Sequence, residues 1–560
     1  MNGRGICKEV FGTEITNEII YRNLLRHLAR TNRVATISEQ FSRLKNNFVR
    51  VNFVYELLAE YDLLPMLLPD RKDNGKAVDF RQLGNEMYKV KKNKEARELY
   101  TKSLVYCEKN SGNISLALAN RSAVLFEYGL YEECLKDIKY ALEHDYPEKL
   151  RWKLEARREK AEKLKFKNTH SNAEPLPRIP RELQSDLIES ASNLVEIRNS
   201  NELGRHVVAK RNIQVGEILA VEKPFCHILI NHFYDHCHEC LQVSYHSVSC
   251  GNCTQVLYCS EECRDKAQYY HKYECSILKT LRNLQLNKLK MLPLKICLVV
   301  KDMYHLIQDL NRMDIGEKYY SSRYKEIHNL MSNTEKRSVS DLFERSASTA
   351  VMYHLVKTYT HFFQKEEEEI IFKDILLHHL QTAPSNFHEI SEISANTDQI
   401  YELDEIGAGA YSFLSLFNHS CSPNVVRHCH GNVIVLRAIQ TIKEGEQCND
   451  NYGYHYALMN KQDRKMKLKD QYYFDCNCEV CLHDWPSLRE LPVIETDIGI
   501  EDQDFLLLQK GDLECAKRIV QNILPRISEL EVPKPNRNHA EMQEVLKQCY
   551  ALFGNIRRTF

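Results

Sequence analysis

At 560 residues the chain is too long for one hydrophobic core, so several packed units are expected, and 43% hydrophobic residues suffice to build them. Its 76 basic and 77 acidic residues give a net charge of −1, which excludes an overall attraction to nucleic acid or to a membrane surface. The N-terminus lacks an apolar signal core, and no stretch approaches the roughly 18 to 20 apolar residues of a membrane span. We therefore expect an intracellular protein whose twenty cysteines bind metal or stay reduced.

Helical periodicity marks the N-terminal part of the chain. In residues 1–75 apolar side chains such as Leu24 and Leu28 recur at helical spacing. In residues 76–167, Ala96 and Tyr100 are followed 38 residues later by Cys134 and Ile138. Small residues alternate there with aromatic ones, as closely packed helix pairs require. This segment resembles tetratricopeptide (TPR) repeats, and an ordinary helical bundle is the alternative.

Five polar residues of this segment stand near the positions where related TPR repeats clamp the acidic C-terminal carboxylate of cytosolic chaperones. They are Arg81, Asn85, Asn120, Lys153 and Arg157. The resemblance implies a chaperone tail as a partner. The alternative is that these are solvated charges of helix surfaces.

Eight metal ligands lie between residues 237 and 275, in the spacing C-x2-C, C-x2-C, C-x3-C and H-x3-C. Eight ligands make two closed tetrahedral zinc sites, which are structural because catalysis needs an open position. The spacing resembles the MYND finger, whose interleaved arrangement implies one zinc on Cys237, Cys240, Cys259 and Cys263, and another on Cys250, Cys253, His271 and Cys275. The nearby His227, His232, His236 and His238 break the spacing and are not expected to bind metal.

The run Asn418, His419, Ser420, Cys421, Ser422, Pro423, Asn424, followed by Gly445, Glu446 and Tyr452, resembles the two signatures of the SET domain. Upstream, the segment from Gly204 to Glu217 resembles its first strands. With the finger inserted between the SET halves, the chain is identified as a member of the SET and MYND domain-containing (SMYD) family of protein-lysine methyltransferases, in its TPR-bearing branch.

This resemblance implies S-adenosyl-L-methionine as the methyl donor. Methyl transfer needs a neutral lysine amine, whose unperturbed pKa is about 10.4, and an apolar channel would lower that pKa. A tyrosine hydroxyl at the end of the channel can make weak CH···O contacts to the methyl group. Tyr452 is the residue expected in this catalytic role. The residues expected to bind the cofactor are Leu203, Gly204, Arg205, Asn396, Asn418, His419, Tyr452 and Phe474.

A third zinc site is expected near the catalytic signature. Cys476, Cys478 and Cys481 offer three thiolates, and a closed site needs four. Cys421, inside the signature, is the natural fourth ligand, as in related post-SET segments. The expected cofactors are therefore S-adenosylmethionine and three zinc ions.

The predicted fold class is α+β: a β-rich SET core with an inserted MYND finger and helical insert, flanked by TPR-like helices at both ends. The expected parts are an N-terminal helical region (1–75), TPR-like repeats (76–167), a linker (168–180), the first SET part (181–236), the MYND finger (237–275), a helical insert (276–400), the catalytic core (401–458), a post-SET zinc segment (459–485) and a C-terminal TPR-like region (486–560).

The predicted function is methylation of lysine in histone or non-histone proteins, in cytoplasm and nucleus, with a role in transcription regulation. Substrates are proteins with an accessible lysine, and neither nucleic acid nor membrane is an expected partner. The alternatives are an interaction scaffold with a weak or inactive SET core, and a DNA-binding zinc finger. The finger's spacing and the net charge of −1 disfavour the second.

Overall fold

The computed structural model describes residues 15–165, 174–301, 318–396, 399–494, 500–531 and 534–559. The start of the predicted N-terminal region, residues 168–173 of the predicted linker and part of the predicted helical insert lie outside these ranges. Among the described helices, none combines the length and the apolar composition that crossing a bilayer takes. The chain divides into two compact units.

The first unit is helical and joins three parts of the chain, which among the described residues are 15–70, 268–301 and 332–383. Ser338 caps the N-terminus of one of its two longest helices, because its hydroxyl accepts a hydrogen bond from the amide of Asp341 at 3.1 Å. Aromatic side chains fill the contacts, as where Phe41 meets Phe343 edge to face. The helices are α1 (Asn17–Arg30), α2 (Val34–Ser42), α3 (Asn47–Glu60), α10 (Leu278–Asn283), α11 (Lys288–Val299), α13 (Val339–Tyr359) and α14 (Glu366–Asn386).

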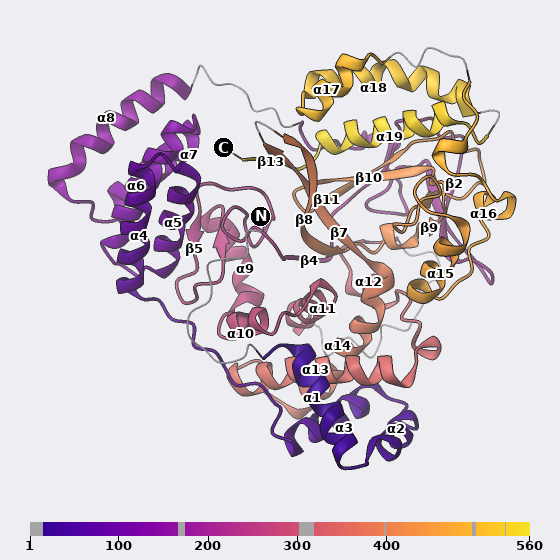
Figure 1. Ribbon diagram of the computed structural model, residues 1–560, viewed down its shortest axis with the longest axis horizontal. Helices are drawn as coiled ribbons and strands as arrows, with labels where there is room; N and C mark the ends of the chain where they lie inside the picture. The colour runs from indigo at the N-terminus through magenta and orange to yellow at the C-terminus, as the bar shows by residue number, and fades with distance from the viewer. Residues whose placement is uncertain are drawn as a thin grey trace. The chain divides into compact units, whose positions relative to one another are not determined.

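The second unit begins with five helices that we call the helical stack (Figure 1). They are α4 (Asn74–Lys89), α5 (Asn93–Tyr106), α6 (Asn113–Glu127), α7 (Tyr131–Glu143) and α8 (Glu148–Lys165). Each helix packs on the next, and α4, α6 and α8 also contact one another in order. Gly84 on α4 lies against the ring of Tyr100 on α5, so closely that a Cβ atom would meet that ring at 2.6 Å. The small and aromatic residues are therefore paired as the sequence pattern indicates.

The helical stack binds the start of the zinc finger through buried charges. Arg121 and Asp137 of the stack have fully buried side chains and form a two-pronged ion pair, with both N···O distances 2.8 Å. Nδ1 of His246 lies 2.6 Å from the same carboxylate. Arg97 forms a single contact with Asp235, from Nη2 to Oδ1 at 2.6 Å. A surface of the stack is thus covered by the segment that leads into the finger.

The β-rich part of the second unit consists of short sheets around one apolar core. Strands β10, β11 and β3 form one antiparallel sheet, and β13, β7, β8 and β4 form another, in which β13 pairs parallel to β7. Two further antiparallel pairs are β1 with β2 and, in the finger, β5 with β6. The strands are β1 (Val195–Ser200), β2 (Gly204–Ala209), β3 (Ile218–Glu222), β4 (Cys226–Leu229), β5 (Val248–Ser249), β6 (Leu257–Tyr258), β7 (Phe387–Asn396), β8 (Gln399–Ala410), β10 (Val425–His430), β11 (Val433–Ala438) and β13 (Ile556–Thr559).

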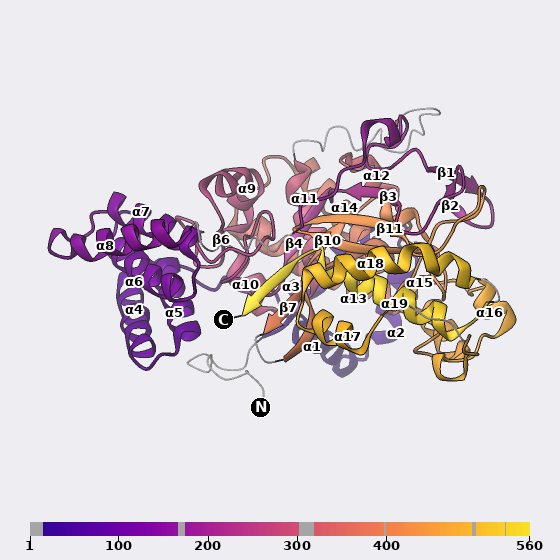
Figure 2. The same cartoon turned by 90° about the horizontal axis from the view of Figure 1, so that it is seen from above.

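The C-terminal helices of this unit lie along its sheets, as Figure 2 shows for α18 and α19. Apolar residues of both helices pack with Val215, Ile393 and Ile439 in a second core. The remaining helices of the SET region and C-terminal part are α12 (Tyr324–His328), α15 (Lys461–Tyr472), α16 (Glu479–His483), α17 (Asp502–Gln509), α18 (Leu513–Ile527) and α19 (Arg537–Leu552). Helix α9 (Glu261–Glu274) completes the finger. The described residues therefore confirm the α+β class.

Candidate active site and metal centres

Two short strands bring the separated signature segments together. Strand β9 (Asn418–His419) pairs in parallel with β12 (Asn449–Asp450), so that Asn449 lies opposite Asn418 and Asp450 opposite His419. Tyr452 follows β12 by two residues, which places it beside His419. The pairing thus assembles residues about thirty positions apart into one site.

The Tyr452 side chain is half-buried, and its hydroxyl donates a hydrogen bond to the carbonyl oxygen of Phe417 at 2.8 Å. Burial raises the pKa of this hydroxyl above its ordinary value of 10.0, with a smaller contribution from the charge of Asp450. The phenol is therefore neutral at physiological pH. Because its proton points to Phe417, its oxygen keeps lone pairs for another contact.

His419 connects this tyrosine to a cluster of cysteines. Its Nδ1 accepts a hydrogen bond from the backbone amide of Tyr452 at 3.1 Å, and its Nε2 lies 3.5 Å from Sγ of Cys421. Burial lowers the pKa of the His419 ring to about 4, so the ring is neutral at pH 7. Phe474 lies on the same side, with ring centroids 6.2 Å apart. Tyr452 thus lies beside the neutral ring of His419, which also neighbours the ring of Phe474.

Asn418 meets the turn that precedes β2. Its Nδ2 lies 3.5 Å from the carbonyl oxygen of Leu203 and 3.1 Å from Oε1 of Gln447. Gly204 has a φ of +63° and open space where a side chain would stand. This leaves a carboxamide, a backbone carbonyl and an uncovered glycine together, which are groups that can hold a polar ligand.

Arg205 and Asn396, also predicted to bind the cofactor, make contacts with other parts of the chain. Arg205 turns its guanidinium to the carbonyl oxygen of Asn329, at 2.7 Å, and lies 4.0 Å from the Glu326 carboxylate. Asn396 ends strand β7, where its backbone pairs with Gln399 and with the C-terminal strand. The side chain of Asn396 lies outside the described part of the structure, so its role in binding the cofactor stays a prediction.

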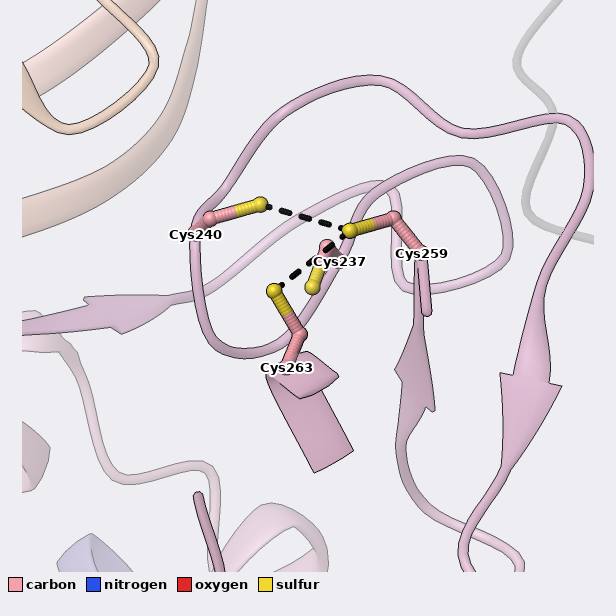
Figure 3. Close-up of side chains that lie close together, drawn as sticks. All are labelled: Cys237, Cys240, Cys259 and Cys263. Carbon is pink, nitrogen blue, oxygen red and sulfur yellow. Dashed lines mark hydrogen bonds between the residues drawn. The ribbon is translucent and has the colours of Figure 1, made fainter. Parts of the chain in front are cut away.

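The three predicted sets of metal ligands come together in space. In each set the ligand atoms lie within 4.8 Å of one another. In the first, Sγ of Cys259 is 3.7 Å from that of Cys240 and 3.5 Å from that of Cys263, and Cys237 completes the group (Figure 3). Four sulfurs bound tetrahedrally to zinc at about 2.3 Å stand roughly 3.8 Å apart, so this spacing fits a zinc ion. The second set is Cys250, Cys253, His271 and Cys275.

The third set lies next to the catalytic signature. Cys421 meets Cys476, Cys478 and Cys481, with 3.6 Å between the sulfurs of Cys421 and Cys481. The amide of Cys421 lies 3.5 Å from Sγ of Cys478. Four soft donors in a buried group are suited to zinc. Outside the three sets, the other described cysteines are buried, and Cys7 lies outside the described residues.

The chain matches the SET domain family over residues 204–453. It is similar to protein-lysine N-methyltransferase SMYD4 of Mus musculus, 26% identical over 77% of this chain and 69% of that protein. SMYD4 of Danio rerio is 25% identical over 80% of this chain and 71% of its own length. The chain therefore carries a SET domain, and over most of its length it is similar to SMYD4 proteins. It is also similar to histone-lysine N-methyltransferase SMYD3 of Homo sapiens, 28% identical over 57% of this chain and 59% of that protein.

His232 and His236, which precede the finger, contact charged side chains. His236 pairs with the buried carboxylate of Glu392 at 2.7 Å. His232 lies 3.7 Å from Asp404, and the guanidinium of Arg557 contacts His232, Glu392 and Asp404. His232, Glu392 and Asp404 bring possible ligand atoms within 4.8 Å of one another, and the Arg557 guanidinium supplies a positive charge in the same group. That His232 binds no metal therefore stays a prediction.

Two residues near the candidate site escaped sequence reasoning. Gln447, beside Asn418, stands in a polar run that offers no distinctive pattern. Arg464 donates from Nε to Sγ of Cys421 at 3.2 Å, although in the sequence it is one of many charges in a basic stretch. Periodicity was its only available signal, because Leu468 stands four residues later on the same buried face.

Proposed function

We propose that this chain is a protein-lysine N-methyltransferase that transfers a methyl group from S-adenosyl-L-methionine to the ε-amine of lysine in histone or non-histone proteins. The observation that carries the proposal is the meeting of Tyr452, His419 and Asn418 beside the open turn at Gly204. The names of the relatives, which are lysine methyltransferases, support it. The proposal includes a cytoplasmic and nuclear location.

The residues present fit the cofactor. The Asn418 carboxamide and the Leu203 carbonyl would hold its polar ends, and Gly204 would let the backbone approach closely. Arg205, engaged with Asn329, would fix this turn. When bound, S-adenosylmethionine supplies a methyl group activated by a cationic sulfur.

Tyr452 and its neighbours would prepare the lysine. Its neutral hydroxyl, fixed on Phe417, can accept weak CH···O contacts from the transferring methyl group. The ring centroids of Tyr452 and Tyr472 lie 4.7 Å apart, and this aromatic pair would exclude water from one side of a bound lysine. Loss of water lowers the pKa of a lysine amine and frees its lone pair for attack. Zinc ions in the three cysteine-rich sets would hold the finger and the post-SET segment in place.

The test is methyl transfer from labelled cofactor to proteins of a cell extract. Tyr452→Phe is expected to lower the labelling at least tenfold while cofactor binding, measured by calorimetry, is kept. Tyr454→Phe is the matched control, since its hydroxyl bonds to Gln471 on the surface. Equal labelling by wild type and Tyr452→Phe, with cofactor bound, would favour the scaffold alternative.

We infer a second function for the helical stack: binding of an acidic peptide C-terminus, such as the tail of a cytosolic chaperone. The predicted clamp residues stand on α4, α6 and α8, the helices that contact one another in order. Asn120 donates to Asn85 at 2.8 Å, and Nε of Arg81 is buried without a hydrogen-bond partner. Lys153 is exposed and lies over the ring of Trp152. Arg157 donates from Nη1 to the carbonyl oxygen of Ala119 at 2.9 Å and to the hydroxyl of Ser122 at 2.6 Å. A carboxylate would therefore meet Arg81, Lys153 and the remaining hydrogens of the amides and of Arg157.

The corresponding test is fluorescence anisotropy with an acidic peptide that ends in a free carboxylate and with its C-terminal amide. Wild type should bind the free acid at least tenfold more tightly than the amide, because charge-assisted hydrogen bonds contribute about 1.5–3 kcal/mol each. Lys153→Ala with Arg157→Ala should remove that preference. Arg158→Ala, at an exposed position of the same helix, should keep it. Equal binding of acid and amide by wild type would refute the clamp.

A further inference from the structure

Arg464 has one of the most completely buried large side chains among the described residues, with 1% of its surface exposed. It lies on α15 and points into the third cysteine set. Nε donates to Sγ of Cys421 at 3.2 Å, and Nη2 to Sγ of Cys481 at 3.8 Å. Nη1 donates to the carbonyl oxygen of Met459. None of the described carboxylates forms an ion pair with it, and the side chains to which it donates are those of Cys421 and Cys481.

A buried guanidinium keeps its positive charge, and an unpaired buried charge costs several kcal/mol. Neutral thiols are weak acceptors and would leave this charge uncompensated. Thiolates would compensate it, and four thiolates around Zn²⁺ carry a net charge of −2. Adding Arg464 brings the sum to −1. Arg464, buried against two of these sulfurs, is thus placed to balance part of the negative charge of a zinc-bound set.

We propose that Arg464 is the counter-charge that allows Cys421, Cys476, Cys478 and Cys481 to hold zinc as four thiolates. On binding, four S–H bonds break, four Zn–S bonds form and four protons leave to solvent, while Arg464 stays protonated. The inference rests on the zinc-bearing methyltransferase proposed above. Arg464 is a positioning residue: it acts on the site through Cys421, whose Sγ lies 3.5 Å from the ring that holds Tyr452.

The first finger set offers an internal comparison. Among the described residues, no guanidinium donates to the sulfurs of Cys237, Cys240, Cys259 or Cys263, whose hydrogen bonds are with one another and with Ser260. A change at Arg464 should thus affect one zinc ion of three. This selectivity separates a charge effect at the third set from a general loss of metal.

The experiment measures zinc by mass spectrometry, and its release to a chromogenic chelator, on the purified full-length chain. Arg464→Met keeps volume and removes charge, and Arg464→Lys keeps charge. Lys465→Met, at the next position of the helix, is the matched control. Wild type and Lys465→Met should hold three zinc ions. Arg464→Met should release one of them ten- to a hundredfold faster, the usual effect of losing an outer-shell partner. The release rate of Arg464→Lys should lie between those of wild type and Arg464→Met.

Cys421→Ser identifies the third ion, since it should lack that ion alone. If Arg464→Met released its zinc at the same rate as wild type, the proposal that Arg464 is a counter-charge would be overturned. If Arg464→Met does not fold, Arg464→Lys decides, because loss of the ion as complete as in Cys421→Ser would overturn it as well. Failure of the methyltransferase proposal would appear separately, as a wild type with three zinc ions and no transfer activity.

Discussion

The backbone amide of Tyr452 donates a hydrogen bond to Nδ1 of His419 at 3.1 Å. A neutral imidazole carries one proton, and Nδ1 acts as the acceptor, so the proton stands on Nε2 and faces Sγ of Cys421, 3.5 Å away. One ring thus joins the backbone of the proposed catalytic tyrosine to a proposed zinc ligand. The position of Tyr452 and the cysteine set are not independent features.

Replacing His419 with phenylalanine should keep the ring and remove both hydrogen bonds. An unsatisfied amide costs about 1–3 kcal/mol, which corresponds to a loss of methyl transfer of roughly five- to a hundredfold if Tyr452 shifts. The measurement is the initial rate at saturating cofactor. His483→Gln, an exposed histidine of α16, should keep the wild-type rate. Unchanged transfer by His419→Phe would mean that Tyr452 is held by other contacts.

Glu222 should give the fold a pH dependence. Its buried carboxylate accepts hydrogen bonds from the amides of Phe413 and Leu414, both at 2.8 Å, yet burial outweighs them and raises its pKa to about 7 from an ordinary 4.5. Because the folded state binds the proton more tightly, this contribution is complete below pH 4.5 and is lost as pH rises to about 7. The total change is about 3 kcal/mol.

The measurement is the thermal unfolding midpoint of wild type and Glu222→Gln between pH 5.5 and pH 8. Wild type should lose stability relative to Glu222→Gln as pH rises toward 7, and the difference should then stay constant. A difference that is the same at every pH would contradict the raised pKa.

Asp137→Asn should loosen the joint between the helical stack and the finger. The substitution leaves the buried Arg121 without its counter-charge, and breaking a buried ion pair costs about 3–5 kcal/mol. Limited proteolysis should then cut near His246 earlier than in wild type. Lys139→Ala removes an exposed pair with Glu143 and should change stability by no more than about 0.5 kcal/mol. Equal proteolysis of Asp137→Asn and wild type would argue against a joint held by this charge pair.

Gly407→Ala should strain the contact between β4 and β8. A Cβ atom there would meet the carbonyl oxygen of Ile228 at 2.3 Å, which backbone must shift to avoid. The expected loss is about 1–3 kcal/mol, seen as a lower unfolding midpoint. Gly112→Ala, whose Cβ would meet nothing within 4 Å, should be neutral or slightly stabilising. Equal midpoints for both variants would contradict this.

Much of the candidate site could be predicted from the spacing of metal ligands and signature residues in the sequence. The finger cysteines and the signature at Asn418 and His419 are local patterns whose chemistry follows from residue type and spacing, and the three sets assemble as predicted. Cys476, Cys478 and Cys481 needed a fourth ligand, and the resemblance to post-SET segments implied that it is Cys421. Such inferences succeed when the chemistry itself demands a number of partners.

Contacts between distant segments could not be predicted in this way. Asp137 meets His246 across 109 positions, and Arg121 meets Asp137 inside a run of unremarkable helix charges. Arg464 looks like a solvated charge until α15 is seen to turn it inward. Whether a charged residue is solvated or forms a specific contact depends on its burial, and burial depends on the fold rather than on the adjacent residues in the sequence.

The third cysteine set also has a consequence for the topology of the chain. Cys421 and Cys476 are 55 positions apart, so a zinc ion bound there ties off a loop that includes Tyr452 and the whole of α15. For a covalent link across a loop of this length, the entropy removed from the unfolded chain corresponds to about 4 kcal/mol. The availability of zinc would therefore determine whether this loop is closed. It would also determine how long the site around Tyr452 stays folded.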